Sequence, residues 1–432
     1  MKEGIGMKYA LTNGKILNGH KDMEVQEGLT VYVEGEKITD IRGGEVPSKG
    51  YRVIDLEGKY LMPGMINMHV HLPASGKPQK KQRDNTKLVQ LVFSNPISAR
   101  IAFEMVAGNA KTEMLSGVTT IRTVGGVKNY DTKLRDAINA GKREGPRILA
   151  SDEGISVPGG HMAGSVAYPA KNIEEALECV HRAQANHADL IKLMITGGVL
   201  DAKEKGTPGE MKMDSAMIKA VCEEAHKLSY IVAAHVESPE GVRAALENGV
   251  DSIEHGAKPD DEIIRLFKEN HAFLTTTLSP ALPFALFDQS VSCADDVGKY
   301  NGEIVFNGIV DCAKRALEEG IPVALGNDVG CPWITHYDFW RELVYYHKFI
   351  GVSNQFALYS GTLGNAELAG IADITGSIDI GKDADLIVTK ENPLDNLEAL
   401  RNVTTVMARG RLYTDYRIKK MIQTERELDK FV

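Results

Sequence analysis

The stretch 61–72 constrains this chain more than any other part of its sequence. Pro63-Gly64 lies near its start, an apolar run follows, and His69 and His71 stand near its end on either side of Val70. Side chains two positions apart on a β-strand point to the same face, so we expect the two imidazoles to project together. Two neighbouring imidazoles at a strand end are half of a metal site. An isolated His-X-His pair is more often an ordinary core or surface feature, so this interpretation depends on matching ligands elsewhere in the chain.

The composition places the chain among ordinary globular proteins. Its 432 residues are 43% hydrophobic and 25% charged, which suits one large α/β barrel with a smaller appended domain. The formal net charge of -9 argues against a nucleic-acid partner. Five scattered cysteines without CxxC spacing favour a reducing compartment. Neither a secretory signal nor a membrane-spanning stretch is evident, so we expect a cytoplasmic protein without a membrane partner.

Short strand patterns separated by tight turns occupy both ends of the chain. They run through 1–62 and recur within 373–432, where a terminal helix follows them. Chain termini often lie close together, which lets two distant segments build one domain. We expect the two ends to form one small β-sandwich, while 63–372 folds separately.

The middle of the chain alternates strand-like runs with helical patterns, which is typical of parallel βα units. The expected strands are 65–72, 117–124, 147–156, 188–196, 230–237, 251–255, 272–278 and 322–328. The clearest helical stretches are 173–186, 215–228, 239–248, 260–270 and 304–319. Eight strands, each followed by a helix, predict a TIM-type (β/α)8 barrel with its chemistry at the carboxyl ends of the strands. A doubly wound open sheet is the alternative, but no Gly-rich dinucleotide fingerprint follows the first strand.

Polar side chains recur where these strands end. A barrel would bring them to one point, and they are His69, His71, Lys192, His235, His255 and Asp328. Four neutral imidazoles and a carboxylate form a strong cation site of the borderline type that suits zinc. The sequence therefore predicts a metal centre at the carboxyl end of the barrel.

Lys192 stands among apolar neighbours in the fourth expected strand. A protonated lysine buried beside divalent cations would be repelled and costly. An unprotonated lysine can instead add carbon dioxide and form a carbamate, whose two oxygens can bridge two metals. The alternative is a lysine that snorkels from the barrel end, and the surrounding histidines favour the carbamate.

With these pieces in place, the chain resembles the metal-dependent amidohydrolase superfamily over about 7–412. The matching pieces are Pro63-Gly64 through His69-Val70-His71, Ile191-Lys192, Ala234-His235, Glu254-His255-Gly256, Asn327-Asp328 and the segment 376–386. The resemblance implies a first divalent metal ion held by His69, His71 and Asp328. It implies a second ion held by His235 and His255. A carboxylated Lys192, carrying a CO2-derived carbamate, would bridge the two ions, and zinc is the expected metal.

A closer likeness is to the branch of Xaa-Pro-dipeptidase-like enzymes and carboxypeptidases that release basic amino acids. Its marks are Gly117-Val118-Thr119-Thr120, Gly159-Gly160-His161, Lys192 with Thr196-Gly197-Gly198, and Ser252-Ile253-Glu254-His255-Gly256. The chain also departs from the branch. Arg122-Thr123 replaces Arg-Asp, Met162-Ala163-Gly164 follows Gly-Gly-His, Asn327 replaces Thr, and Val236-Glu237-Ser238 stands where an aromatic residue is common. These departures leave the metal ligands intact and bear on the substrate.

The expected mechanism follows from charge. Two divalent cations lower the pKa of a bridging water and supply hydroxide near neutral pH. Asp328 would take the proton of that water and pass it to the leaving nitrogen. His161, on the loop after the third strand, is expected to bind substrate and steady the developing oxyanion. Packing against Met162 is an equally good explanation of a loop histidine.

Substrate contacts are expected from residues around the centre. Glu237 lies two residues beyond His235, where it would recognise an amine if the strand persists; a solvated loop carboxylate is the alternative. His336 follows the eighth strand and is a further candidate for substrate contact. The first loop carries basic residues that would attract a substrate carboxylate or lie on a solvated surface, namely Lys77, Lys80, Lys81 and Arg83. The segment 279–301 is long for a βα connection, and such loops are often lids or subunit contacts.

These expectations combine into one function. We expect a binuclear-metal hydrolase that cleaves an amide bond of a small molecule, a dipeptide or N-acyl amino acid, by attack of a metal-bridging hydroxide. Hydrolysis of a cyclic amide, carbamate or lactone at the same site is the first alternative. A mononuclear deaminase fits less well because such relatives lack the bridging lysine, and a non-catalytic scaffold would have lost ligands. Large barrels of this kind often self-associate, so we expect a homo-oligomer.

Overall fold

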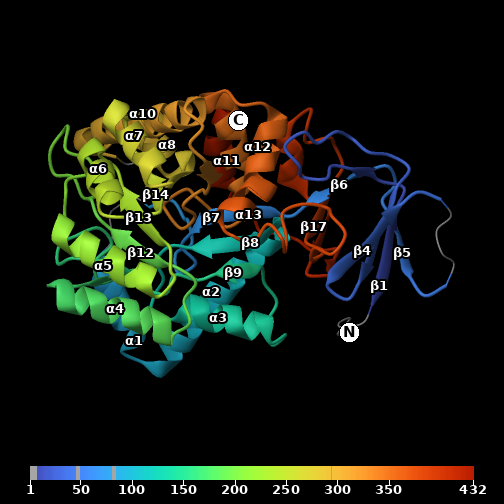
Figure 1. The fold of residues 1–432 in the computed structure, drawn as a ribbon, viewed down its shortest axis with the longest axis horizontal. Helices are drawn as coiled ribbons and strands as arrows, with labels where there is room; N and C mark the ends of the chain where they lie inside the picture. The colour runs from blue at the N-terminus through green and yellow to red at the C-terminus, as the bar shows by residue number, and fades with distance from the viewer. Residues whose placement is uncertain (1–6, 45–48, 80–83, 293) are drawn as a thin grey trace.

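The computed structural model describes residues 7–44, 49–79, 84–292 and 294–432. Figure 1 shows two bodies side by side: a barrel of strands surrounded by helices, and a smaller body of strands at its flank. Segments from the two ends of the chain, blue and red in Figure 1, meet where the smaller body joins the barrel. This is the α/β barrel with a β-sandwich from both chain ends that the sequence predicted.

The barrel is built from parallel strands. In chain order they are β7 (Met65–Val70), β8 (Val118–Thr123), β9 (Arg147–Leu149), β10 (Gly154–Ser156), β12 (Ile191–Met194), β13 (Val232–Val236), β14 (Ser252–His255), β15 (Phe273–Thr276) and β16 (Val323–Leu325). An isolated parallel bridge between Val70 and Val329 closes the ring after β16. Strands β7, β8 and β12 to β16 are buried at every position, which is typical of a parallel sheet covered on both faces.

The expected strand 147–156 is wrong as a single strand. β9 pairs with β8, whereas β10 pairs with β12 and with the short β11 (Ala167–Pro169). Between them Asp152 has a φ of 61°, a left-handed conformation that interrupts an extended chain. The Asp152 N–H donates to the Asp131 carboxylate, and the Asp152 carboxylate accepts from Asn186. These long-range hydrogen bonds hold the break, and the local sequence does not reveal them.

Helices cover the outside of the barrel (Figure 1), and many begin at a side-chain cap. They are α1 (Asn85–Phe93), α2 (Pro96–Leu115), α3 (Tyr130–Asn139), α4 (Ile173–Ala185), α5 (Ser215–Lys227), α6 (Pro239–Glu247), α7 (Asp261–Glu269), α8 (Leu278–Leu286), α9 (Gln289–Ser292), α10 (Asp296–Glu318), α11 (Phe339–Tyr345), α12 (Asn354–Tyr359), α13 (Asn365–Leu368) and α14 (Ile422–Leu428), with the π-helices η1 (Tyr346–Ile350) and η2 (Ser360–Gly364) and the 3-10 helices η3 (Leu397–Asn402) and η4 (Asp429–Phe431). Asp214, Ser238 and Asp260 cap α5, α6 and α7, because each side chain accepts the backbone N–H three residues on. The expected starts of these three helices are confirmed to within one residue.

The segment 279–301 is largely helical, which corrects the expectation of a long loop. It contains most of α8, all of α9 and the first turns of α10. The buried Glu342 carboxylate lies at the start of α8 and accepts the Leu278 N–H at 2.5 Å and the Ser279 N–H at 2.9 Å. Pro283 lies inside α8. Proline is disfavoured in the interior of a helix, so the sequence pattern did not predict a helix here. A role as a lid or subunit contact stays a prediction.

The β-sandwich combines two sheets, ordered β4-β3-β1-β5 and β19-β18-β17-β6-β2. Their strands are β1 (Lys8–Thr12), β2 (Lys15–Ile16), β3 (Thr30–Glu34), β4 (Lys37–Arg42), β5 (Arg52–Asp55), β6 (Tyr60–Pro63), β17 (Leu386–Thr389), β18 (Thr405–Ala408) and β19 (Arg411–Tyr413). Leu11, Val31 and Leu61 share one buried cluster with Leu386 and Met407. The sandwich core is therefore made by residues from both ends of the chain.

The chain crosses from the sandwich to the barrel at Gly64. β6 ends at Pro63 and β7 begins at Met65. A Cβ on Gly64 would lie 2.1 Å from the Thr119 hydroxyl oxygen, so a larger residue would collide with β8. The Pro-Gly pair thus sets the start of the strand that carries His69.

The last segment packs back on the barrel, and Figure 1 shows the C-terminal end over its helices. Arg341 on α11 donates to the Asp429 carboxylate at 2.6 Å, and the Phe431 ring stacks on Phe287 with centroids 5.6 Å apart. α14 and η4 are therefore anchored to the barrel, while β17 to β19 belong to the sandwich.

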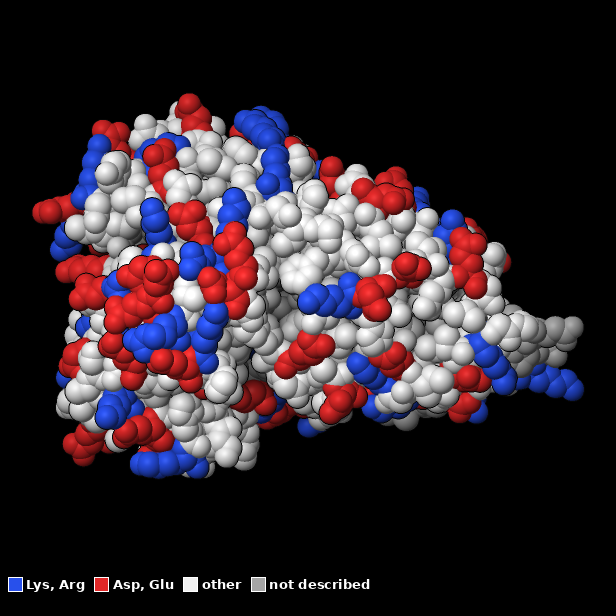
Figure 2. All heavy atoms as spheres, turned by 45° about the horizontal axis from the view of Figure 1, so that its top comes forward, with Lys and Arg blue, Asp and Glu red and all other residues white. Residues whose placement is uncertain are grey.

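Acidic and basic side chains are interspersed on the face shown in Figure 2, so the net charge of -9 does not form one continuous acidic field there. Within the described residues, no helix combines the length and apolar character that a membrane span requires.

Candidate metal centre

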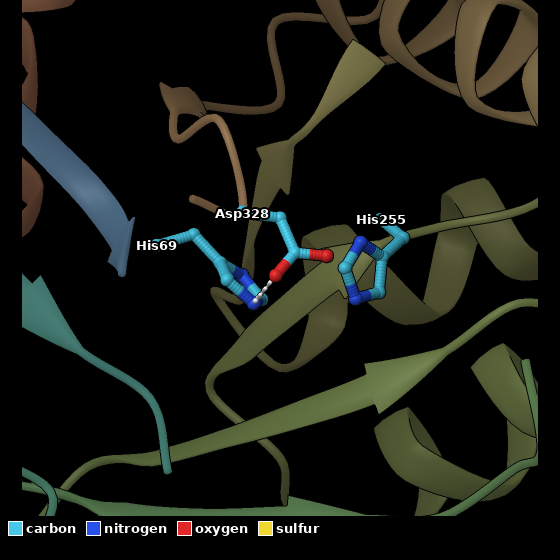
Figure 3. A group of neighbouring side chains, drawn as sticks. All are labelled: His69, His255 and Asp328. Carbon is cyan, nitrogen blue, oxygen red and sulfur yellow. Dashed lines mark ion pairs between the residues drawn. The ribbon is translucent and has the colours of Figure 1, made fainter. Parts of the chain in front are cut away.

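The carboxyl ends of the barrel strands bring the expected metal ligands together. His69, His255 and Asp328 each offer a ligand atom within 4.8 Å of the other two. Figure 3 shows the Asp328 carboxylate between the rings of His69 and His255. A further histidine lies next to each of these rings. The ring centroids of His71 and His69 are 5.3 Å apart, and those of His235 and His255 are 4.6 Å apart. The structure therefore gathers residues that are distant in the sequence into one centre.

The first half of the centre consists of His69, His71 and Asp328. His69 Nδ1 lies 2.7 Å from a Glu254 carboxylate oxygen, and His71 Nδ1 lies 3.0 Å from the Gly125 carbonyl oxygen. Both partners accept hydrogen bonds, so in the neutral rings Nδ1 carries the proton and Nε2 presents a lone pair. The two Nε2 atoms lie 3.5 and 3.3 Å from Asp328 Oδ1. The two Nε2 lone pairs thus face a carboxylate oxygen, which is itself a hydrogen-bond acceptor. A cation between these three atoms would bind all of them.

The second half contains His235 and His255. His235 Nε2 lies 3.3 Å from the Gly197 carbonyl oxygen, and His255 Nδ1 lies 2.6 Å from the Thr277 hydroxyl. Each ring is held through one nitrogen, which leaves the other nitrogen free to bind a metal. Such outer hydrogen bonds are the usual way in which a protein orients metal-binding histidines.

Burial sets the protonation state of these ligands. It lowers the pKa of His69 to about 4 and lowers the pKa values of His235 and His255 well below the ordinary value. Burial alone would raise the pKa of Asp328, but the neighbouring His69 and His71 hold it well below the usual range. Neutral imidazoles and an ionised carboxylate are the forms in which these groups bind metal ions.

Two of the candidate ligands occupy rare backbone conformations. His255 has a φ of 68° and Asp328 a φ of 50°, the left-handed region that residues with a side chain seldom adopt. Such strained positions persist only where the surrounding structure over-determines them, and they concentrate at functional sites.

Lys192 lies in β12 beside the centre and is 1% exposed. Among the described residues its Nζ has no hydrogen-bond partner. Burial outweighs the nearby charges of Glu254 and Asp328 and lowers the pKa of Lys192 to about 8. A buried amine without a partner is costly, and a carbamate bound to two cations would remove that cost. The surroundings of Lys192 therefore fit the carbamate and disagree with a lysine that snorkels to solvent.

A buried ion pair that the sequence analysis did not recognise supports the first half. Glu254 bonds His69 through one carboxylate oxygen and accepts from Arg122 at 2.7 Å through the other. Arg122 also donates to the Met68 carbonyl at 2.7 Å and to the Thr275 hydroxyl at 3.0 Å. The one signal in the sequence was the presence of charged residues inside otherwise apolar strands.

His161 joins the second half through ring stacking. Its ring lies on that of His235 with centroids 4.0 Å and planes 5° apart. Asp201, in the segment after β12, has Oδ2 at 2.5 Å from His161 Nδ1 and accepts the Gly198 N–H at 2.8 Å. Asp201 was not recognised in the sequence because it is 40 positions from His161 and belongs to a hydrophilic segment.

Glu237 also lies in the second half. One of its carboxylate oxygens is within 4.8 Å of ligand atoms of both His235 and His255. Burial raises the pKa of Glu237 to about 8, and the charges of Asp328 and Asp201 add to the effect. These surroundings differ from those of a solvated loop carboxylate.

His336 is used elsewhere in the fold. It is 4% exposed, its Nε2 lies 2.7 Å from the Ala74 carbonyl oxygen, and its Nδ1 lies 3.1 Å from Glu113. Nε2 thus holds the loop after β7 and Nδ1 faces a carboxylate of α2, so these contacts offer no support for a role in substrate binding. On the same loop Lys77 is exposed. The other basic residues of that prediction lie outside the described residues, namely Lys80, Lys81 and Arg83.

Comparisons with known proteins agree with this architecture. The family model described as the amidohydrolase family matches residues 60–413. A Bifidobacterium longum protein provisionally assigned as a prolidase superposes with a TM-score of 0.86 at 35% identity, over 99% of both chains. A Xaa-Pro dipeptidase, solved with methionine in its active site, superposes with a TM-score of 0.82 at 30% identity, over 94% of this chain and 100% of its own. Ochratoxinase from Aspergillus niger is 26% identical over 384 residues, which cover 82% of this chain and 75% of that protein.

These relatives confirm the resemblance to a dipeptidase-like branch. They also establish the chain as a hydrolase that acts on carbon–nitrogen bonds, in a family that is generally metal-dependent. The chain belongs to the amidohydrolase family.

Proposed function

We propose that this amidohydrolase binds two divalent metal ions and cleaves the amide bond of a dipeptide or an N-acyl amino acid. One observation carries the proposal: Nε2 of His69 and Nε2 of His71 lie 3.5 and 3.3 Å from Asp328 Oδ1, an arrangement that a metal cation between these atoms would stabilise. The donor set of imidazoles and carboxylates is of the borderline type, and zinc is the metal that suits it.

The ligands divide between two ions. His69, His71 and Asp328 would hold the first. His235 and His255 would hold the second, and Lys192 would bridge both as a carbamate. Its neutral amine adds to CO2, which forms one N–C bond and releases one proton. When bound, the ions supply Lewis acidity that polarises a carbonyl group and lowers the pKa of a water.

Two side chains of the centre then act on protons and charge. Asp328 takes the proton of the attacking water on its carboxylate and delivers it to the leaving nitrogen. His161 directs Nδ1 at Asp201, which leaves Nε2 to donate to the carbonyl oxygen as negative charge develops. Asp201 holds the His161 ring in the orientation that this contact requires.

The relatives support the choice of substrate class. A protein named Xaa-Pro dipeptidase is 30% identical to this chain and holds methionine in its active site. Cyclic amides, carbamates and lactones remain the alternative substrates for the same centre.

The test combines metal analysis with a substrate library. The protein is loaded with zinc in the presence of bicarbonate, its metal content is measured, and free amino acid release is followed with dipeptides and N-acyl amino acids. We expect two ions per chain and release that depends on the C-terminal residue. One ion per chain would point to a mononuclear centre. Two ions without release would contradict the substrate class and turn attention to the alternatives.

A further inference from the structure

Glu237 occupies a position in the second half that the assigned ligands do not explain. It lies one residue beyond the end of β13, two positions after His235, so the strand alternation places both side chains on the same side. One Glu237 carboxylate oxygen and the ligand nitrogens of His235 and His255 lie within 4.8 Å of one another. Metal–ligand bonds of about 2.0–2.2 Å place the ligands of one ion within about 4.4 Å of each other. The spacing of this group is close to that of ligands around a single ion.

Hydrogen bonds fix Glu237 in this position. Its N–H donates to the Thr196 hydroxyl at 3.1 Å, and its Oε2 accepts the Val199 N–H at 3.1 Å. Oε1 has no donor among the residues that the structure describes. One oxygen therefore anchors the carboxylate to the segment after β12, and the other is available to a ligand.

The charges around Glu237 favour a cation. The carboxylates of Asp328 and Asp201 are close enough to act on it electrostatically. The Nζ of Lys192, buried beside the same centre, has no hydrogen-bond partner among the described residues. Glu237 is half-buried, and a carboxylate that is partly removed from water beside two others is costly unless a cation lies among them.

We propose that Glu237 is a ligand of the second metal ion, together with His235, His255 and the carbamate of Lys192. This inference rests on the two-metal centre of the proposed function. Glu237 adds one anionic oxygen to a set that otherwise has two imidazole nitrogens and one carbamate oxygen. In a centre that contains two divalent ions, one carbamate and the Asp328 carboxylate, the Glu237 carboxylate lowers the net charge by one unit.

A role in metal binding differs from the recognition of a substrate amine. A ligand changes the affinity for metal in the absence of any substrate, whereas an amine receptor changes KM and leaves the metal in place. The two roles are therefore separable by a measurement without turnover.

The experiment compares Glu237→Gln and Glu237→Asp with the wild-type enzyme. All are loaded with cobalt(II) and bicarbonate, metal per chain is measured, and the second ion is titrated against a competing chelator while the visible cobalt spectrum is recorded. We expect Glu237→Gln to weaken the second ion on the order of 100-fold and change the spectrum, with the first ion retained. Glu237→Asp keeps the charge and should give an intermediate affinity.

Glu240→Gln is the matched control, because Glu240 is exposed and only three positions away. It should bind both ions as the wild type does. The inference is overturned if Glu237→Gln binds two ions with wild-type affinity and an unchanged spectrum. In that case a raised KM confined to substrates with a free amine would assign Glu237 to substrate recognition. A wild-type enzyme that binds fewer than two ions would instead contradict the proposed function.

Discussion

The two halves of the metal centre are built in different ways. In the first half, His69 and its partners Glu254 and Arg122 have side-chain exposures of 1%, 0% and 1%, and all three belong to barrel strands. In the second half, His161 and Asp201 have side-chain exposures of 21% and 32% and belong to connecting segments. A buried ionic network on strands supports His69 in the first half, whereas loop residues lie against His235 in the second half.

We expect this difference to separate metal binding from substrate chemistry. Strands hold side chains more rigidly than loops do, so His69 and the ion pair behind it have a more rigid support than His161 and Asp201. Loops at the carboxyl face of a barrel vary more and are the usual source of specificity. We therefore expect changes in the first half to alter metal content and stability, and changes in the second half to alter turnover as well.

The largest expected effect comes from the residue between the halves. Lys192→Ala removes the bridge to both ions, so metal content should fall and activity should drop by about 1,000-fold or more. Metal analysis and steady-state kinetics measure the two effects. Lys227→Ala is the control, because that lysine is 69% exposed on α5. Wild-type metal content and activity in Lys192→Ala would refute the bridge.

The next effect should be confined to the first half. Glu254→Gln removes the charge between His69 and Arg122, which should weaken the first ion by about 10–100-fold and destabilise the fold by about 3–5 kcal/mol. Metal titration and urea unfolding would measure these changes. Glu269→Gln, whose partner Arg265 is on the surface of α7, should cost less than about 1 kcal/mol. Equal weakening of both ions would contradict the division into halves.

The assembly of the centre should depend on pH through Lys192. Its pKa is lowered to about 8 by burial, so below that pH the ammonium form dominates and cannot add CO2. At a fixed concentration of dissolved CO2, the activation rate of metal-free protein should rise about tenfold from pH 6 to pH 7 and level off above about pH 8. Activation after addition of metal is followed with time. A rate that does not change with pH would exclude carbamate formation as the limiting step.

The smallest effect should appear in the second half. Asp201→Asn weakens the hold on His161, so we expect kcat to fall roughly tenfold while both ions remain bound. Asp311→Asn, an exposed change on α10, is the control. A loss of the second ion from Asp201→Asn would show that Asp201 acts on the metal site as a whole rather than on His161.

Much of the metal centre was predictable because it depends on local patterns. Strand alternation indicated that His69 and His71 share a face, and the barrel rule placed His235 and His255 at neighbouring strand ends. The isolated lysine in an apolar strand identified Lys192. Such features lie within a few residues of each other or follow from the fold class.

The supporting contacts were not predictable in the same way. The contacting pairs are far apart in the sequence. The separation is 40 positions for Asp201 and His161, 132 for Arg122 and Glu254, and 223 for Glu113 and His336. No local period connects such pairs. The break in the strand at Asp152 and the helix over 278–286 were not predicted for the same reason, because residues distant in the sequence stabilise both.

By itself the sequence determined the barrel and the sandwich from both ends and indicated the candidate metal ligands, because hydrophobic periodicity and ligand spacing are properties of neighbouring residues. Only the tertiary structure decided which side chains support those ligands, that His336 holds a loop, and that Glu237 lies with His235 and His255. These depend on side chains that meet only after folding, where burial and distance decide their charge and their partners.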